Sequence, residues 1–253
     1  MEIEKYFNDP EWPEAVDMKL VCDDSSDKEK TERAKDIIDI LLPKDYKEKS
    51  ILDFGTGEGH TSRVLKENGV QKVFGFDINN NFIKDENLNL TTDWEIIEKN
   101  APYDYIIAYD VMDHLERINI AEALYLLYDV LNPDGKLFVR YHPFTSRHGG
   151  HLYKNINKAY VHLILNQQEK DKYLMEKPVY TEPYAMPLTI YREAAKFSKF
   201  LIESEQNMTS KVEDFFFKDD ISNRIIKNLG VTTFPLSQMS LQFIDQILIR
   251  SNT

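Results

Sequence analysis

Three glycines on alternate positions follow a short apolar run in the stretch ILDFGTGEGHTS, residues 51–62. The chain has only nine glycines, so this concentration reflects a local requirement of the backbone. Glycine lets a turn adopt left-handed conformations and lets a ligand approach the main chain closely. A helix beginning near Thr61 would direct its free N–H groups to the same place. The stretch therefore predicts a ligand-binding turn between a strand and a helix.

Segments with strand and helix patterns alternate from about residue 30 to residue 145. Helical spacing of apolar residues is seen over 31–42 and 117–131. Apolar runs predict strands at 50–54, 72–77, 87–90, 103–110, 136–142, 200–206 and 240–250. Strands separated by helices form a parallel sheet that is covered on both faces. We expect an α/β, Rossmann-like, doubly wound and mostly parallel seven-stranded sheet.

The domain organisation follows from the place where this alternation stops. Residues 143–190 mix aromatic residues, histidines, glycines and prolines without a clean strand pattern. We interpret them as a lid or substrate insertion after the fifth strand. Residues 1–45 are expected to form an N-terminal helical segment, and the whole chain, 1–253, a single domain.

Composition excludes several classes of protein. The net charge of -12 repels a polyphosphate backbone and so disfavours nucleic acid as a partner. No apolar run approaches the roughly 18 residues of a membrane span. Cys22 is the only cysteine, which excludes an intramolecular disulfide and a cysteine-cluster metal site. The acidic, proline-broken start lacks the pattern of a secretory signal, and we expect a cytoplasmic protein.

Two common phosphate-binding motifs do not fit the glycine-rich turn. A dinucleotide fingerprint requires a third glycine at residue 60, where this chain has histidine. A P-loop requires a lysine after its second glycine, and the segment Gly59-His60-Thr61 lacks it. Phe54 also stands where the first glycine of a P-loop should be.

A third pattern fits without adjustment. ILDFGTGEG resembles the first motif of class I S-adenosylmethionine-dependent methyltransferases. The segments TTDW, YDYIIAYDVMDHL and LNPDGKLFVRYH are similar to later motifs of the same family, in the same order. The resemblance covers about residues 40–142 and 190–250. It implies a Rossmann-like enzyme that uses S-adenosyl-L-methionine as its cofactor.

The resemblance also implies a set of cofactor-binding residues. They are Asp53, Gly55, Thr56, Gly57, Gly59, Asp77, Ile78, Asp93, Trp94 and Asp110. In this interpretation the turn holds the methionyl end and the sugar, Asp77 accepts hydrogen bonds from the ribose diol, and Asp93 and Trp94 meet the adenine. Asp110 borders the methyl-donor site. The alternative for Asp77, a carboxylate that ends a strand, is a simple helix N-cap.

The acceptor is predicted from a local inversion of charge. No Asp or Glu occurs between Asp134 and Glu169, whereas lysines and arginines do. This segment lies just after the fifth strand, at the edge where ligands of doubly wound sheets bind. We therefore expect a small anionic acceptor. The candidate substrate-binding residues are Arg140, Arg147, His148, His151 and Tyr153. A solvated basic surface that pairs with the acidic remainder of the chain remains an equal alternative.

Four of the six histidines also gather in this region, namely His142, His148, His151 and His162. Imidazole titrates near neutrality, and His142 at a strand end is the candidate general base. We expect no metal site, because two glycines separate two of the histidines and no carboxylate is near them in the sequence. Two other functions stay open: a regulatory protein that binds S-adenosylmethionine without catalysis, and an enzyme of the same fold that cleaves it by another route.

Overall fold

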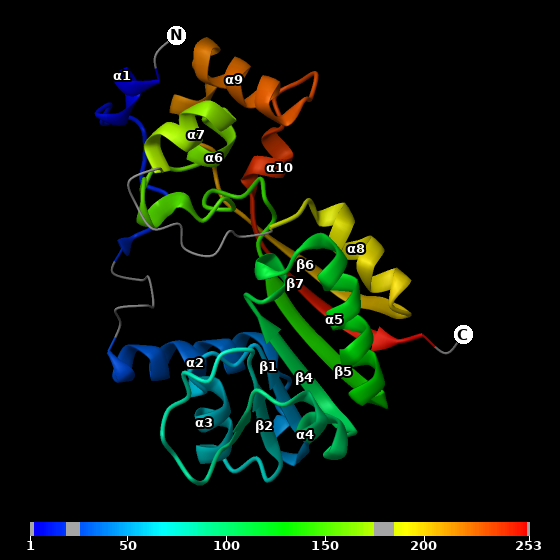
Figure 1. Ribbon diagram of the computed structural model, residues 1–253. Coiled ribbons are helices and arrows are strands. Elements are labelled where there is room, and N and C mark those ends of the chain that lie inside the picture. The colour runs from blue at the N-terminus through cyan, green and yellow to red at the C-terminus, as the bar shows by residue number, and fades with distance from the viewer. Residues whose placement is uncertain (1–2, 19–25, 175–184, 252–253) are drawn as a thin grey trace.

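The computed structural model describes residues 3–18, 26–174 and 185–251. Seven strands form one sheet in the order β3-β2-β1-β4-β5-β7-β6 (Figure 1). The parallel strands are β1 (Ile51–Phe54), β2 (Val73–Phe76), β3 (Asn89–Thr91), β4 (Tyr103–Tyr109) and β5 (Leu131–Tyr141). The antiparallel strands are β6 (Phe200–Thr209) and β7 (Leu241–Arg250). The predicted mostly parallel, seven-stranded sheet is confirmed.

Helices cover both faces of the sheet (Figure 1). On one face α2 (Asp27–Leu41) and α3 (His60–Glu67) pack against alternate strand residues such as Ile51 and Ile107. On the other face Leu52 and Ile106 meet α4 (Trp94–Lys99), α5 (Arg117–Val130) and α8 (Leu188–Phe197). Successive side chains of a strand point to opposite faces, so each buried strand contributes to both layers.

The helix α2 begins earlier than the apolar pattern predicts. Ser26 accepts a hydrogen bond from the backbone N–H of Glu29, and the Glu29 carboxylate accepts one from the backbone N–H of Ser26. This reciprocal capping satisfies helix N–H groups that otherwise have no partner, and it starts the helix four residues before Thr31. The helix ends at Leu41, just before Pro43.

The strand β5 also begins earlier than predicted. The segment Asn-Pro-Asp-Gly was expected to form a separate turn at 132–135. It lies within β5, but the register against β4 jumps there: Tyr103 pairs with Leu131, and Tyr105 with Lys136. The expected turn is therefore an irregularity at the start of the strand.

A third hydrophobic cluster lies beyond the carboxyl end of the sheet and forms the core of a second lobe, the upper part of Figure 1. It joins three parts of the chain: the N-terminus, the segment after β5, and the segment between β6 and β7. The elements of this lobe are α1 (Glu4–Phe7), η5 (Leu152–Lys154), α6 (Val161–Ile164), α7 (Gln167–Leu174), η6 (Asp214–Phe217), α9 (Asp219–Leu229) and α10 (Leu236–Ser240). The predicted insertion therefore shares a core with two distant segments, and residues 175–184 of it lie outside the described residues.

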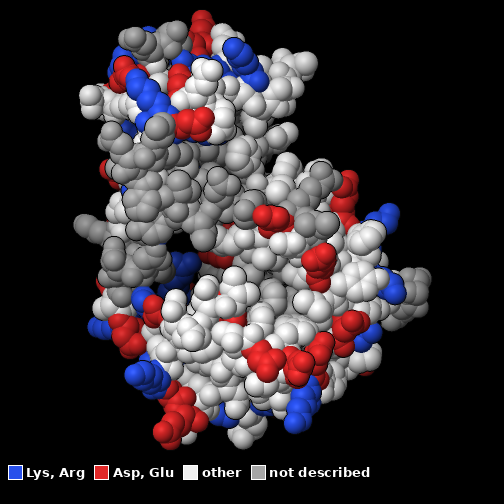
Figure 2. Space-filling model, viewed as in Figure 1, with Lys and Arg blue, Asp and Glu red and all other residues white. Residues whose placement is uncertain are grey.

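The surface agrees with the charge balance of the sequence. On the face viewed in Figure 2, Lys and Arg side chains are interspersed with Asp and Glu, and the basic residues of the described part form no continuous patch there. None of the helices in the described ranges is long and apolar enough to cross a bilayer.

Candidate functional site

The glycine-rich turn has the backbone that its sequence predicts. Gly55, Gly57 and Gly59 have φ values of 74°, 57° and 95°, in the left-handed region that L side chains rarely adopt. A Cβ at Gly55 would lie 2.3 Å from Val111, and one at Gly59 would lie 2.5 Å from Leu90. A Cβ at Gly57 would meet no atom within 4 Å. Packing thus requires the outer two glycines, while Gly57 borders open space.

Asp53 stabilises the turn through hydrogen bonds. Its buried carboxylate accepts hydrogen bonds from the hydroxyls of Thr56, at 2.5 Å, and Ser62, at 2.9 Å. Burial raises the pKa of Asp53, and the two hydroxyls oppose that rise. The side chain therefore holds the conformation of the turn, and it also lines the cavity described below.

Asp77 follows β2 and reaches across to the turn. Its Oδ2 accepts a hydrogen bond of 2.9 Å from the backbone N–H of Gly57, and its Oδ1 accepts one from Asn79. No helix follows over residues 78–88, so the alternative of a helix N-cap is wrong. The tip of β2 and the turn after β1 are thus joined directly.

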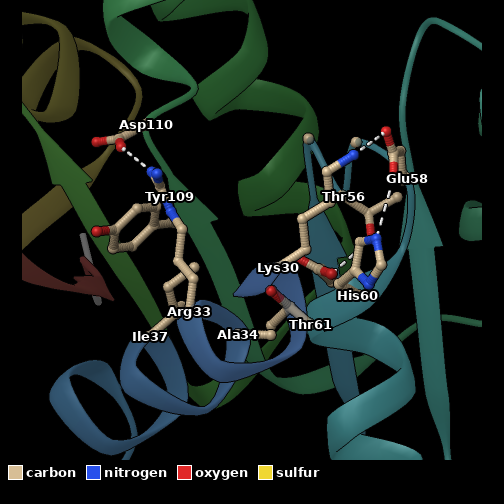
Figure 3. Close-up of a pocket in the computed structure, with 13 residues that line it drawn as sticks. Lys30, Arg33, Ala34, Ile37, Thr56, Glu58, His60, Thr61, Tyr109 and Asp110 are labelled. Carbon is tan, nitrogen blue, oxygen red and sulfur yellow. Dashed lines mark hydrogen bonds and ion pairs between the residues drawn. The ribbon is translucent and has the colours of Figure 1, made fainter. Parts of the chain in front are cut away.

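A cavity of about 400 Å³ opens between this turn and α2 (Figure 3). Lys30 of α2 forms an ion pair of 2.7 Å with Glu58, and Arg33 of α2 forms one of 3.2 Å with Asp110. The cavity is lined by Lys30, Arg33, Ala34, Ile37, Asp53, Gly55, Thr56, Gly57, Glu58, His60, Thr61, Tyr109 and Asp110. The first three turns of α2 therefore form one wall of the cavity.

Asp110, directly after β4, has two unusual features. Its φ of 51° is a strained conformation for a residue with a side chain. Its Oδ1 is buried without a hydrogen-bond donor in the described part of the chain, while Oδ2 pairs with Arg33. Burial raises the pKa of Asp110 to about 6, although Arg33 and Arg140 lower it. Asp110 therefore lines the cavity and has one buried acceptor atom without a partner among the described residues.

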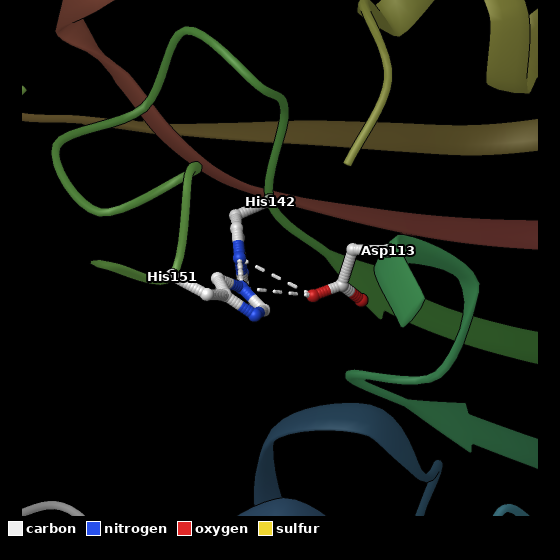
Figure 4. A group of neighbouring side chains, drawn as sticks. All are labelled: Asp113, His142 and His151. Atoms are coloured by element: carbon white, nitrogen blue, oxygen red, sulfur yellow. Dashed lines mark hydrogen bonds and ion pairs between the residues drawn. The ribbon is translucent and has the colours of Figure 1, made fainter. Parts of the chain in front are cut away.

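A cluster of histidines lies at the neighbouring strand ends. His142 follows β5, and its Nε2 is 3.2 Å from Oδ2 of Asp113 and in close contact with Nε2 of His151 (Figure 4). The His148 ring centroid is 4.6 Å from that of His142. Burial lowers the pKa of His148 to about 4 and that of His151 to about 3, so both rings are neutral at pH 7.

The sequence profile of the methyltransferase domain family matches residues 26–177. The chain belongs to this family. The match includes the glycine-rich turn, the cavity wall from α2 and the histidines after β5. No curated protein sequence matches the chain significantly.

Solved structures share the fold of this methyltransferase. The PH0226 protein of Pyrococcus horikoshii is 18% identical with a TM-score of 0.56, and 99% of this chain and 100% of that chain are covered. A S-adenosylmethionine-dependent methyltransferase of Archaeoglobus fulgidus is 14% identical with a TM-score of 0.52, covering 88% and 94%. A phosphoethanolamine N-methyltransferase of Haemonchus contortus is 16% identical with a TM-score of 0.51, covering 87% and 53%. The predicted class I methyltransferase, with S-adenosylmethionine as cofactor, is confirmed.

The cavity of the methyltransferase suits this cofactor chemically. S-adenosylmethionine carries a sulfonium and an ammonium group, and Asp110 supplies a carboxylate oxygen that no other described group occupies. The open space at Gly57 is where a side chain would obstruct a ligand on the turn. The residues that line the cavity therefore fit the charge and the space requirement of the cofactor.

Five predicted cofactor residues do not line the cavity. Gly59 and Asp77 belong to the turn or bond to it, and the other three make contacts elsewhere. Asp93 caps α4 by accepting a hydrogen bond from Glu95, and the Trp94 ring packs edge-on against Phe76. Ile78 is 83% exposed. All three lie beyond the tips of β2 and β3, and their contact with an adenine stays a prediction.

Two predicted substrate residues of the methyltransferase are already paired within the protein. Arg140 donates to both carboxylate oxygens of Asp245. Arg147 donates to the Glu213 carboxylate and, through Nε and Nη2, to the backbone carbonyl of Glu14. These contacts favour the alternative that the basic residues after β5 pair with the acidic remainder of the chain.

Sequence reasoning missed several residues that the structure places at the site. Lys30 and Arg33 lie before the first motif, and their role depends on how α2 packs. Asp113 is not among the predicted site residues, and it brings a carboxylate next to the histidines in space although none is near them in the sequence. The available signal was its position in AYDVMD, three residues after Asp110. His162 instead contacts the carbonyl of Phe144 within the second lobe.

Proposed function

We propose that this methyltransferase transfers the methyl group of S-adenosylmethionine to an oxygen or nitrogen atom of a small anionic acceptor. The observation that supports it best is the arrangement of an open glycine turn, an unpartnered oxygen of Asp110 and a polar cluster at the ends of β4 and β5. When bound, the cofactor supplies an electrophilic methyl group on a sulfonium. The protein must align an acceptor lone pair with it and exclude water.

The residues on the side of the methyl donor have separate roles in binding the cofactor. The main chain of Gly57 lets the cofactor approach the turn, and the carboxylate of Asp77 beside it is available to the ribose diol. Asp110 Oδ1 would accept from the ammonium group. Asp93, Trp94 and Ile78 would meet the adenine at the adjacent strand tips. Gly55, Gly59, Asp53 and Thr56 hold the turn in shape.

The acceptor side is assigned to the region of β5 and the segment after it. His148, His151 and Tyr153 lie together there, with the ring of Tyr153 6.2 Å from His148 and 6.1 Å from His151. Arg140 and Arg147 are paired with carboxylates, so the support for an anionic acceptor rests on the other feature of this segment, the absence of any Asp or Glu between Asp134 and Glu169. The Haemonchus enzyme binds phosphomonomethylethanolamine, a small phosphorylated amine, on a similar fold. Arg140 and Arg147 contribute to this side through their ion pairs, which hold β7 and the second lobe to it.

Proton removal from the acceptor is assigned to the cluster that contains His142. His142 is not among the residues that line the donor cavity, and its Nε2 is directed to Asp113 and His151. A histidine beside a carboxylate, here at 3.2 Å, is a common arrangement of a general base. The role of His142 as a base stays a prediction.

Product analysis tests the proposed function. The protein is incubated with S-adenosylmethionine and a panel of small phosphorylated and carboxylated alcohols and amines. We expect S-adenosylhomocysteine to form only with a matching acceptor. Methylthioadenosine would instead show cleavage by another route. Tight binding of the cofactor by calorimetry, with no product from any acceptor, would favour the regulatory alternative.

The anionic character of the acceptor is tested separately. Lys154 is the basic residue next to Tyr153 in the segment, and partial burial lowers its pKa. Replacing Lys154 with Ala should raise the Michaelis constant for an anionic acceptor and leave that for the cofactor unchanged. Lys136→Ala is the matched control, because Lys136 lies on the same segment and pairs with Glu203 on the surface. Equal effects of the two substitutions would contradict an anionic acceptor.

A further inference from the structure

Three buried side chains from separate parts of the chain converge on one point at the carboxyl end of the sheet (Figure 4). Asp113 lies in the short helix η4 (Met112–His114), His142 follows β5, and His151 precedes η5. One oxygen of the carboxylate and one nitrogen of each ring all lie within 4.8 Å of one another. Oδ2 of Asp113 is 3.2 Å from His142 Nε2 and 3.6 Å from His151 Nε2.

The carboxylate of Asp113 lacks the partners that a buried charge requires. Its side chain is fully buried, and neither oxygen accepts a hydrogen bond from any described residue. Its ion-pair neighbours in the described ranges are the rings of His114, His142 and His151, with no lysine or arginine among them. A buried carboxylate without a cation or donors costs several kcal/mol, of the order expected for an unpaired buried charge.

Hydrogen bonding inside the cluster cannot satisfy all three groups. A single N–H between the two contacting Nε2 atoms of His142 and His151 uses the only proton that either nitrogen can share with the other. The carboxylate then has no donor, in agreement with its unpartnered oxygens. Nδ1 of His142 is also buried without a partner in the described chain. A cation at the point of convergence would satisfy the lone pairs of all three ligand atoms together.

The backbone around His151 is built to bring it back to His142. His151 has a φ of 49°, a strained value for a residue with a side chain. A Cβ at Gly149 would lie 2.4 Å from the carbonyl oxygen of Phe144, and one at Gly150 would lie 2.2 Å from Cβ of His162. The two glycines that separate the histidines in sequence therefore permit the tight loop that joins them in space.

We propose that Asp113, His142 and His151 bind a divalent transition-metal ion. Two imidazoles and one carboxylate are a ligand set of zinc and of non-haem iron, whereas magnesium and calcium prefer oxygen ligands alone. Three protein ligands leave at least one coordination position open for water or a substrate oxygen. Asp113 is three residues after Asp110, which lines the proposed cofactor cavity, so the proposed metal site lies at the same strand ends.

The position of the ion indicates a role for it in methyl transfer, and this role rests on the proposed function. An acceptor oxygen bound at the open position would be polarised and would lose its proton more readily. With its Nε2 bound to the ion, His142 would serve as a ligand in place of a general base. An anionic acceptor would also be attracted to the ion in a chain of net charge -12. Metal binding itself does not depend on which acceptor is used.

Metal content and cobalt spectroscopy test the site on the full chain. The purified protein is stripped with a chelator, titrated with Co²⁺, and then challenged with Zn²⁺. We expect one equivalent per chain, with visible bands of a four- or five-coordinate ion that Zn²⁺ displaces. Asp113→Asn and His151→Gln should each weaken Co²⁺ affinity by more than about 100-fold, because loss of a ligand exceeds the effect of its supporting residues.

The controls separate loss of a ligand from loss of the fold. His60→Gln replaces a buried histidine of α3 outside the cluster, and it should retain the cobalt spectrum. Binding of S-adenosylhomocysteine by calorimetry should be unchanged in Asp113→Asn, which would show an intact fold. If Co²⁺ is bound equally by the protein and both cluster variants, or only weakly without the four- or five-coordinate spectrum, the metal site is refuted. A missing methyl-transfer product would count against the proposed function alone.

Discussion

At the scale of single residues, a comparison of Gly57 with Gly69 distinguishes a glycine that a ligand requires from one that only the backbone conformation requires. Gly57 and Gly69 both have positive φ values, 57° and 96°, and a Cβ at either would meet no atom within 4 Å. Gly57 lines the cavity, whereas Gly69 ends α3 on the far side of the turn. A ligand in the cavity would therefore meet a side chain added at position 57 but not one added at position 69.

Replacing Gly57 with Ala should weaken binding of S-adenosylhomocysteine by at least about tenfold, which corresponds to about 1.4 kcal/mol. The added methyl group occupies the space that the ligand needs on the turn. Gly69→Ala is the matched control, since both substitutions cost about 1–2 kcal/mol of backbone strain. Calorimetry and thermal unfolding of both variants give the comparison, and equal affinities would place the ligand elsewhere.

Asp110 gives a prediction about pH. Its pKa is raised to about 6 by burial, so the folded protein holds a proton there that the unfolded chain releases near the ordinary value of 3.8. The stability of the free protein should therefore fall as pH rises through this window. Binding of the cationic cofactor should strengthen over the same range, because the ionised carboxylate attracts it. Groups that face Asp110 are Arg33 of α2, Arg140 of β5 and Asp245 of β7.

Calorimetry with S-adenosylmethionine below and above about pH 6 measures this effect. Affinity should change by up to about tenfold per pH unit below the pKa. The variant Asp110→Asn should bind more weakly above the pKa and show a flatter profile. A wild-type profile that keeps its slope in the variant would assign the titration to another group.

At the scale of elements, α2 is both a layer of the core and a wall of the cavity. Ile38 and Leu41 on one side of the helix are buried against the sheet, while Lys30 and Arg33 reach the glycine turn and Asp110. The helix start at Ser26 therefore affects the site as well as the fold.

Replacing Ser26 with Ala should destabilise the protein by about 1 kcal/mol through loss of the cap. It should also weaken cofactor binding by less than about tenfold, because fraying of the first turn loosens the ion pair of Lys30 with Glu58. Lys35→Ala removes an exposed pair with Glu32 in the same helix and serves as the control. Identical unfolding temperatures for the two variants would argue against the cap.

At the scale of the whole molecule, the described residues form two lobes, and each draws on segments that are not consecutive in the sequence. One lobe is the sheet with a hydrophobic cluster on each face, and the second lobe has its own cluster. Trp12 from the N-terminus is buried against Phe215, and its Nε1 donates to the backbone carbonyl of Ala159. The second lobe is therefore held by contacts between residues that are about 150 to 200 positions apart. It carries the loop with His151.

Replacing Trp12 with Ala should cost about 3–5 kcal/mol within the second lobe. Hydrogen exchange should speed up over α6, η6 and α9 and remain slow in β1 and β4. Trp94→Ala is the matched control, because Trp94 is the other tryptophan and packs at the tips of β1 and β2. Uniform loss of protection in both variants would mean that the two lobes unfold as one unit.

Much of the fold and part of the site could be predicted from short segments. The strands at 50–54 and 103–110 and the glycine turn have local patterns, because alternation, capping and positive φ depend on neighbours in the sequence. The resemblance placed Asp77 at the cofactor turn as a partner of a ribose diol, whereas its hydrogen bond with the backbone N–H of Gly57 was seen only in the structure.

Other parts of the site depend on contacts that no short pattern encodes. The ion pairs of Arg140 and Arg147 join residues 66 or more positions apart, and they changed the interpretation of both side chains. The wall formed by Lys30 and Arg33 depends on how one helix packs across the sheet.

The sequence alone determined a mostly parallel α/β sheet with a glycine-rich turn after β1, since glycine conformation and hydrophobic periodicity act over a few residues. The methyltransferase family was indicated by the resemblance of short motifs. Only the tertiary structure decided that Asp113 meets His142 and His151, and that one lobe draws on three segments. The physical reason is that burial and charge pairing act between groups that are close in space, whatever their separation along the chain.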